Sequence, residues 1–323
     1  MRRRYLGVGI VAAVLCGGSA GPFVSSVVSS AAPPSATGSV AAGHGSGTGG
    51  TATPLAGNDV SYPQCGVSLP ASPAFGVVGV NDGVANDLNP CLAPSSSYPS
   101  YAQSELYWAV ARSTGKTSEP KASVYVNTGD PGNFYDGTPI ADWPTSGTTP
   151  TGTCATTTVT SKGRTYTVGQ NSSACAWQYG YDKAQQDVAW LHDAADAVDA
   201  QAPPVSVPTT ASSYPWWLDV ETGNTWQSGT AGIAMNVAAL QGMVAAMSAA
   251  GVSSVGVYST SSQWSAIAGT TTSASGDLYG LADWVPGASN LTQAVDECSS
   301  ASFTRGKVLL TQWTTTFDYD HAC

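Results

Sequence analysis

Residues 216–221 read Trp-Trp-Leu-Asp-Val-Glu, and this short apolar run decides the fold because of its neighbours. Residues 176–200 before it have the apolar spacing of a long amphipathic helix. Residues 233–250 after it predict a second helix, which Gly251 ends as a C-cap. A buried strand between two helices is the repeating unit of a parallel βαβ arrangement.

The same alternation continues on both sides of this unit. Further strands are predicted at residues 55–61, 75–80, 122–127, 255–258, 278–284 and 307–312, and a further helix at residues 102–113. Alternation over this length of chain favours a single α/β domain, a TIM-like (β/α)8 barrel, over two smaller domains. Residues 133–173 break the rhythm, because they are rich in Thr, Gly and Pro. We therefore expect a long insertion there, braced by a disulfide.

The N-terminus has the pattern of an export signal. Arg2, Arg3 and Arg4 precede a short apolar run at residues 6–16, which small residues follow. Residues 1–31 are predicted to be a signal peptide, with cleavage near either Ala20 or Ala31. Residues 32–54 consist almost entirely of Ala, Pro, Ser, Gly and Thr and predict a disordered linker. The globular domain is expected at 55–323, secreted to the extracellular side or the cell envelope.

Composition excludes some partners. Of the 323 residues, 42% are hydrophobic and only 10% are charged, against roughly 25% in an ordinary soluble domain. The net charge is −10, so there is no basic surface to neutralise the phosphates of a nucleic acid. After the signal, no stretch has the eighteen or so consecutive apolar residues of a membrane span. We expect a monomer that does not span a membrane.

Cysteine usage supports export. Removal of the signal leaves six cysteines, an even number that predicts disulfides in an exported protein. Six cysteines allow 15 pairings, and their spacing suggests nearest neighbours: Cys65 with Cys91, Cys154 with Cys175, and Cys298 with Cys323. The alternative is a metal site. Because the chain has no CxxC or HxxxH spacing and only three His, we expect neither a metal nor another cofactor.

The strand at 216–221 also carries candidate chemistry. Alternate residues of a strand share a face, so Trp217, Asp219 and Glu221 are expected on one side, and Leu218 and Val220 on the other, toward the helices. Two acids at the C-terminal end of a buried strand are costly unless they are paired or used, and barrel enzymes place catalysis at that end. The alternative is that Asp219 caps the next helix while Glu221 is solvated.

Two further acidic strings lie beside predicted strands. Asp59 ends the first strand, where Asn and Asp also favour turns. Asp318 and Asp320 stand two residues apart after the last strand, where the alternative is a solvated C-terminal tail. Cys323 would restrain that tail.

Taken in order, these strings resemble those of the family-25 glycoside hydrolases, muramidases that cut peptidoglycan. Residues 59–64 are similar to the D-V-S-x-x-Q opening of that family, residues 219–221 to its D-x-E, and Gln312-Trp313 with Asp318 to its closing residues. A group of secreted, uncharacterised relatives is more similar still, sharing DVSYPQC at 59–65, NPCLA at 89–93, WWLDVETGN at 216–224 and LTQ…DYD at 310–320. Pro63 stands where the family usually has Trp.

The resemblance implies hydrolysis of β-1,4 linkages in the N-acetylated glycan of a cell wall. It implies that Glu221 is the general acid, that Asp219 orients or stabilises the substrate, and that Asp59 and Asp318 complete an acidic cluster. In such a cluster the carboxylates cannot all ionise cheaply, so at least one pKa is expected to rise.

Six side chains near the predicted strand ends are candidates for contact with carbohydrate, since aromatic rings stack on sugars and amides donate hydrogen bonds. They are Tyr125, Asn127, Trp217, Tyr258, Trp284 and Gln312. The alternative for the aromatic ones is core packing. Two other functions stay open on the same scaffold: a non-catalytic carbohydrate-binding or wall-binding protein, and a hydrolase-like protein with another role in the envelope.

Overall fold

A computed structural model describes residues 55–82 and 87–323 of the chain. The signal peptide predicted at 1–31 and the linker predicted at 32–54 lie outside the described residues. The described residues from Leu55 to Cys323 belong to one compact unit.

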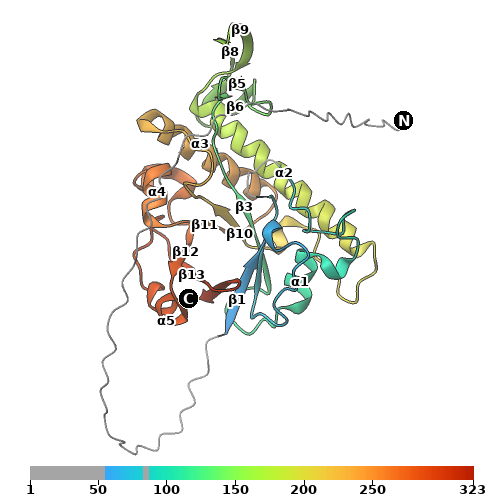
Figure 1. Ribbon diagram of the computed structural model, residues 1–323. Coiled ribbons are helices and arrows are strands. Elements are labelled where there is room, and N and C mark those ends of the chain that lie inside the picture. Colours follow the sequence, from blue (N-terminus) through green and yellow to red (C-terminus); the bar gives the residue numbers. More distant parts are fainter. Residues whose placement is uncertain (1–54, 83–86) are drawn as a thin grey trace, which may run out of the picture. The chain divides into compact units, whose positions relative to one another are not determined.

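Eight strands form a closed barrel at the centre of this unit (Figure 1). Around the barrel they run β1 (Ala56–Val60), β2 (Gly76–Gly79), β3 (Ala122–Asn127), β10 (Trp216–Asp219), β11 (Val255–Tyr258), β12 (Ala282–Ala288), β13 (Val308–Thr314) and β14 (Asp318–Ala322). The first seven are parallel to their neighbours, whereas β14 is antiparallel to both β13 and β1. The fold is therefore a mixed α/β barrel.

The last strand corrects the prediction of an all-parallel (β/α)8 barrel. Only residues 315–317 separate β13 from β14, whereas a crossover between parallel strands needs a dozen or more residues. The chain must therefore reverse and pair antiparallel. The segment with Asp318 and Asp320 is a barrel strand rather than a solvated tail, and Asp318 lies directly opposite Asp59 in the register.

The helices are also fewer than a (β/α)8 barrel requires. The described residues contain α1 (Glu105–Arg112), α2 (Ser173–Asp199), α3 (Gly229–Ala249), α4 (Ser261–Ile267) and α5 (Leu291–Glu297). Short 3-10 turns supplement them: η1 (Tyr62–Gln64), η2 (Tyr101–Gln103), η3 (Ala211–Ser213) and η4 (Ser273–Leu278). Only η1 lies between β1 and β2, and no helix lies between β13 and β14.

One predicted strand was misplaced. Residues 278–284 were expected to form the sixth strand, but η4 occupies the start of that range and β12 begins at Ala282. Gly280 has φ 87°, in the left-handed region that only glycine adopts readily, so a strand cannot run through it.

The barrel strands divide the core into two parts. Val78, Val124, Trp216, Leu218 and Val220 pack outward in the main core beneath the helices. Inside the barrel, a second cluster contains Phe75, Val77, Trp217, Trp284 and Leu310. The predicted sidedness of residues 217–220 is therefore correct: Leu218 and Val220 face the helices, and Trp217 faces the interior.

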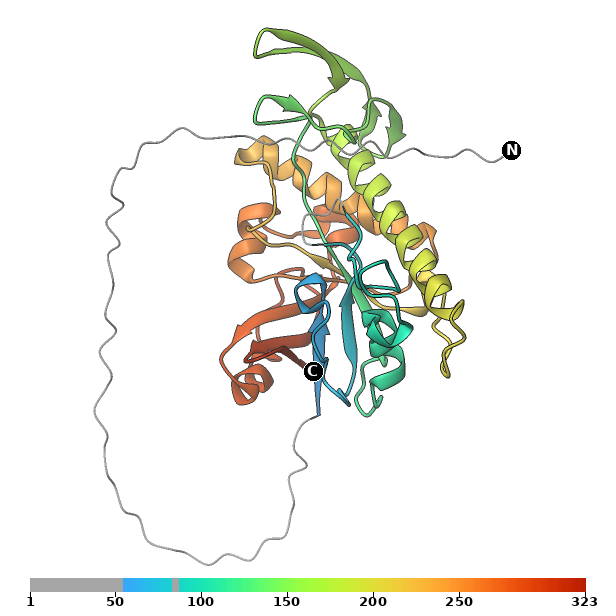
Figure 2. The same cartoon turned by 45° about the vertical axis from the view of Figure 1, so that its right-hand side comes forward.

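The two longest helices, α2 and α3, lie against each other (Figures 1 and 2). By length and composition alone α3 could cross a membrane, since its mean hydropathy is 1.4. Here its apolar residues instead pack in the core, where Leu240, Met243 and Met247 are buried. Glycines permit the close contact: a Cβ on Gly180 would lie 1.9 Å from the carbonyl oxygen of Ala239, and one on Gly242 would lie 2.0 Å from that of Trp177.

The predicted insertion consists of three small β-hairpins gathered at the N-terminal end of α2 (Figure 2). They pair β4 (Phe134–Tyr135) with β5 (Thr138–Pro139), β6 (Gly147–Thr149) with β7 (Gly152–Cys154), and β8 (Thr156–Ser161) with β9 (Arg164–Gly169). A small core joins them to α2, in which Trp143 stacks on Tyr179 with ring centroids 5.2 Å apart.

The three disulfides pair as predicted from their spacing: Cys65–Cys91, Cys154–Cys175 and Cys298–Cys323. The second ties the insertion to the first turn of α2, and the third ties the end of β14 to the residue that follows α5.

The contact between α2 and α3 leads to a stability prediction. Gly180→Ala and Gly242→Ala are each expected to lower the free energy of unfolding by about 1–3 kcal/mol, because the added methyl group meets backbone rather than a movable side chain. In an open helix the same change would stabilise by about 0.5–1 kcal/mol. Urea denaturation of the purified variants measures the change.

Gly223→Ala is the matched control, since a Cβ at Gly223 meets nothing within 4 Å. Equal stabilities for the two helix variants and the control would show that the helices do not make this contact.

Candidate active site

One pocket, of about 230 Å³, lies where the carboxyl ends of the parallel strands meet the start of β14. Its lining residues are Asp59, Tyr125, Asp219, Glu221, Tyr258, Trp284, Gln312, Thr314 and Asp318. Eight of these nine were candidates from the sequence, and Thr314 is the addition. The pocket thus brings together residues from three acidic strings that are more than 90 positions apart in the chain.

The barrel order sets where the four acids stand around this pocket. β10 and β14 are four strands apart in either direction around the closed barrel, so they lie on opposite sides of it. Glu221 follows β10 and Asp318 begins β14, and both are half-buried. Asp59 and Asp219 are buried, with 8% and 6% of their surface exposed. The pocket is therefore lined by two half-buried carboxyls that come from opposite sides of the barrel and by two buried ones.

A chain of hydrogen bonds orients Asp59. The hydroxyl of Tyr258 donates to Oε1 of Gln312 over 2.9 Å, and Nε2 of Gln312 donates to Oδ2 of Asp59 over 2.8 Å. Burial first, and the charge of Asp318 second, raise the pKa of Asp59 to about 7, although the bond from Gln312 opposes the rise.

Beneath Asp59 lies Asp320, which was not among the candidate site residues. It is fully buried, accepts a hydrogen bond of 2.9 Å from Nε1 of Trp284 and lies close enough to Asp59 for the two carboxyl groups to interact electrostatically. Two buried carboxyl groups near each other cannot both ionise cheaply. Burial, followed by the charge of Asp59, raises the pKa of Asp320 well above its ordinary value. The alternation of Asp318 and Asp320 was the available signal, but it applies only if the segment is a strand.

Asp219 is a further acid of the site whose pKa lies well above its ordinary value. Burial is the main cause of its raised pKa, and the charges of Glu221 and Asp59 add to it. The predicted rise of at least one pKa in the acidic cluster is therefore present at Asp59, Asp219 and Asp320.

Glu221 is fixed by a residue from a distant helix. Nε2 of Gln263, in α4, donates to Oε1 of Glu221 over 3.3 Å. Oε1 of Gln263 in turn accepts from the backbone N–H of Thr222 over 2.7 Å, so this glutamine is itself held in place. Nε1 of Trp226 donates to the backbone carbonyl of Glu221 over 2.9 Å. No sequence spacing relates Gln263 to Glu221, so only the fold reveals the contact.

Trp284 forms an aromatic base for the pocket. Its ring meets the rings of Tyr258, Trp217 and Tyr125 edge-on, with centroids 4.6, 5.8 and 6.2 Å away. Tyr125 and Tyr258 reach the pocket with it, whereas Trp217 does not. The ring of Trp217 fills the barrel interior beside Gly256, where a Cβ would lie 2.3 Å from it. For Trp217 the alternative of core packing therefore holds.

Asn127 also lies outside the pocket lining. Its backbone N–H and its Nδ2 both donate to Oδ1 of Asn81, over 2.8 and 3.3 Å, and its carbonyl accepts from Nδ2 of Asn81. This residue therefore joins the ends of two strands, since Asn81 comes shortly after β2.

The pocket lining contains four carboxyl groups and no Lys, Arg or His. The ion pairs Lys162–Asp136, Lys183–Asp142 and His192–Asp196 involve none of Asp59, Asp318 or Asp320. In the described part of the chain, one group of side chains has metal-ligand spacing, namely Cys65, Cys91 and Glu105, but its two sulfurs are bonded to each other. Protonated carboxyl groups in this pocket could donate hydrogen bonds or protons to a polar ligand.

Buried acids make the stability of the fold depend on pH. Burial raises the pKa of Asp59 and Glu105 to about 7, of Asp130 to about 6 and of Asp187 to about 8. The folded state therefore keeps protons that the unfolded state releases near pH 4. The stabilisation is complete below about pH 4 and is lost as the pH rises through 6 to 8, at about 1.4 kcal/mol per pKa unit for each group. Urea denaturation across this range should show the fall.

Asp187→Asn is the matched variant for this measurement, because Asp187 lies outside the pocket and is hydrogen-bonded to Asn81. In this variant the free energy of unfolding should fall less steeply with pH, by the contribution of about one proton. A free energy of unfolding that rises between pH 5 and 8 would contradict the assignment of neutral buried acids.

Comparison with known proteins assigns no family. No family model matches the sequence, and no curated protein matches it. Among solved structures, the chain is similar to a muramidase from Trichobolus zukalii, at 11% sequence identity and a TM-score of 0.37, over 83% of this chain and 93% of that one. A similarity this distant carries no argument about function, so the chemistry of the pocket has to be judged from its own residues.

Proposed function

We propose that the protein is an exported glycoside hydrolase that cleaves β-1,4 linkages of N-acetylated cell-wall glycan by carboxylate acid catalysis. The observation that carries the proposal is the placement of Glu221 and Asp318 on opposite sides of one pocket, above the buried acids Asp59 and Asp219. Glycosidases use a pair of carboxyl groups that flank the scissile bond.

Glu221 is proposed as the general acid that protonates the leaving glycosidic oxygen. It is half-buried and lines the pocket, so a substrate can reach it. The bonds from Gln263 to its side chain and from Trp226 to its carbonyl hold it in place before substrate arrives. Such positioning is the part of acid catalysis that a protein fold supplies.

Asp219 is proposed to orient the substrate. A neutral carboxyl can both donate and accept a hydrogen bond, which suits the amide of a 2-acetamido group. Burial, with the charge of Glu221 adding to it, raises the pKa of Asp219 well above its ordinary value, which favours the neutral form.

The rest of the lining suits a sugar ring. Tyr125, Tyr258 and Trp284 offer aromatic surface, and Gln312 and Thr314 add polar groups. None of the residues of the three insertion hairpins lines the pocket, so the insertion does not fill the space between the carboxyls. Because the insertion leaves the pocket open, a catalytic function is favoured over a non-catalytic protein whose pocket is blocked.

Export is part of the proposal. The three disulfides are typical of proteins that fold outside the reducing cytosol. Cell-wall glycan is a substrate that an exported hydrolase can reach.

Glu221→Gln is expected to lower the release of reducing ends from purified peptidoglycan by about a hundredfold or more, because glutamine cannot give up a proton. Glutamine keeps the size of the side chain and can still accept the bond from Gln263, so the circular dichroism spectrum and urea midpoint should match those of the wild type. A reducing-sugar assay measures the activity.

Glu297→Gln is the control, since Glu297 lies in α5, outside the pocket, and is bonded to Gln293. Full activity in Glu221→Gln would remove Glu221 from the chemistry. Wild-type protein that binds the glycan but releases no reducing ends would instead identify a carbohydrate-binding protein.

A further inference from the structure

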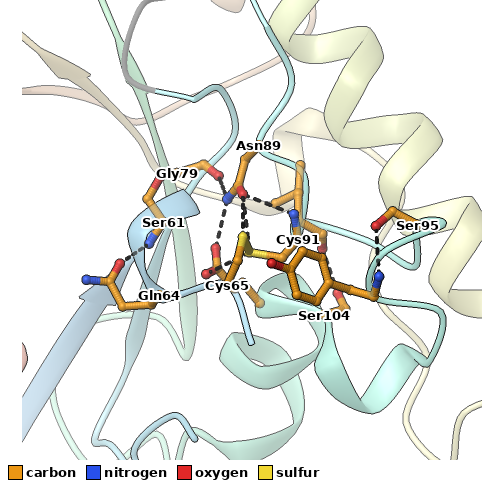
Figure 3. The surroundings of a disulfide bond; sticks show 11 residues. Ser61, Gln64, Cys65, Gly79, Asn89, Cys91, Ser95 and Ser104 are labelled. Carbon is orange, nitrogen blue, oxygen red and sulfur yellow. Dashed lines mark hydrogen bonds between the residues drawn. A yellow bond between two sulfur atoms is a disulfide. The ribbon is translucent and has the colours of Figure 1, made fainter. Parts of the chain in front are cut away.

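The Cys65–Cys91 disulfide lies against a buried carboxyl group. Oε1 of Glu105 is 3.1 Å from Sγ of Cys91, and Glu105 has 1% of its surface exposed. Figure 3 shows the surroundings of this disulfide, with Asn89 beside both sulfurs. Neither this contact nor this glutamate has a part in the proposed glycan chemistry.

Geometry shows which form of Glu105 the contact suits. A disulfide sulfur has no hydrogen to donate, so the short contact is a hydrogen bond only when the carboxyl carries a proton and donates it to sulfur. Burial raises the pKa of Glu105 to about 7, although a hydrogen bond from Asn89 opposes the rise. The ion pairs Lys162–Asp136, Lys183–Asp142 and His192–Asp196 do not include Glu105.

Asn89 holds the carboxyl in this orientation. Its Nδ2 donates to Oε2 of Glu105 over 2.7 Å and to the carbonyl of Gly79 over 2.8 Å, which leaves Oε1 turned to the sulfur. Its Oδ1 accepts from the backbone N–H of Cys91 over 3.2 Å. Asn89 thus anchors both the acid and the cysteine.

The two sulfurs differ in access. Cys91 is fully buried, whereas Cys65 is half-buried in the loop after η1. A nucleophile from solvent therefore reaches Cys65, and Cys91 becomes the leaving group. A thiolate left behind in the protein interior is costly unless it is protonated at once, and Glu105 stands within reach to do so.

We propose that Cys65–Cys91 is a thiol-exchange site for small-molecule thiols, with Glu105 as its acid. The incoming thiolate attacks Sγ of Cys65 and forms a mixed disulfide, the Cys65–Cys91 bond breaks, and Glu105 transfers its proton to the departing sulfur of Cys91. A second thiolate attacks the mixed disulfide at the sulfur of the first thiol. It releases Cys65 as a thiolate, which takes its proton from water, and the two small thiols leave as their disulfide.

A pocket of about 450 Å³ adjoins this site, which is a size typical of small-molecule pockets. Gln64 and Gly66, the neighbours of Cys65, line it together with Glu105, Trp108 and Arg112. Because Glu105 borders the pocket, water there can return the proton that the exchange consumes.

The other two disulfides provide internal controls. Sγ of Cys154 is 3.3 Å from the carbonyl oxygen of Pro144, and Sγ of Cys298 is 3.8 Å from that of Ala294. A carbonyl oxygen has no proton to give. Among the three disulfides, only Cys65–Cys91 has an acid at its sulfur in the described structure.

The site is linked to the glycan pocket through Ser61. This residue lies between Asp59 and Cys65, and its side chain and the ring of Tyr125, which lines the pocket, both lie against Gly79. When the Cys65–Cys91 bond breaks, the C-terminal end of residues 59–65, the segment that contains Ser61, is no longer tied to Cys91.

The first test treats the full protein with glutathione, traps the products with acid and maps them by mass spectrometry. The expected product carries glutathione on Cys65 and a free thiol on Cys91, before either other disulfide reacts. An adduct on Cys91, or earlier reaction of another disulfide, would overturn the proposal. A reduced thioredoxin-like protein is the second arm, and a faster reaction with it would replace the small thiol by a protein partner.

The second test follows the rate, divided by the thiolate concentration, against pH. The other titratable or charged groups around Glu105 are Tyr107 and Arg112 from α1, which line the same pocket, and Tyr125 from β3, whose pKa the charge of Glu105 helps to raise. The wild-type rate should fall as the pH rises through about 7, as Glu105 loses its proton. Glu105→Gln should react at least about tenfold more slowly, with a flat profile, and Glu105→Asp should restore part of the rate.

Asp187→Asn, which removes a buried acid that is not bonded to a sulfur, should leave the rate unchanged. Equal rates and profiles for wild type and Glu105→Gln would overturn the role of Glu105. The adduct map of the wild type needs no variant and does not depend on glycan hydrolysis, so it tests this site separately from the proposed function.

Discussion

The pairing of β14 between β1 and β13 is the contact on which the structure depends. It closes the barrel, and the same register sets Asp318 opposite Asp59 and turns Asp320 inward beneath it. Without β14, β1 and β13 would each expose an edge, and the candidate pocket would lose the wall that faces Glu221. The Cys298–Cys323 disulfide holds the end of this strand.

Burial of acids in a chain that has few cations is the second constraint. The chain has 11 Lys and Arg against 21 Asp and Glu, so its buried carboxyls depend on amides, hydroxyls, indoles and one another. Asp59 is bonded by Gln312 and Glu105 by Asn89, whereas Asp187 is bonded by Asn81 and also interacts with the charge of Lys183. Each of these groups is stable mainly in its neutral form, so the same physics that lets the fold bury acids also supplies protons at the two proposed reactive sites.

The two sites lie at the ends of one short segment. Asp59 belongs to the candidate pocket and Cys65 to the disulfide beside Glu105, with Ser61 between them. The insertion, in contrast, packs on α2 through Trp143 and Tyr179 and contributes nothing to the pocket lining. The Cys154–Cys175 disulfide ties this insertion to α2, and neither cysteine lines the pocket.

The sequence pattern was sufficient to predict those features that depend on residues close together in the chain. Apolar periodicity located α2, α3 and most of the parallel strands, alternation separated Leu218 from Trp217, and short spacings identified all three disulfides. The reversal into β14, the partnership of Asp59 with Asp320 and the bond from Gln263 to Glu221 were decided only by the tertiary structure. The last two contacts join residues 261 and 42 positions apart, and their geometry depends on how the barrel closes rather than on any local preference.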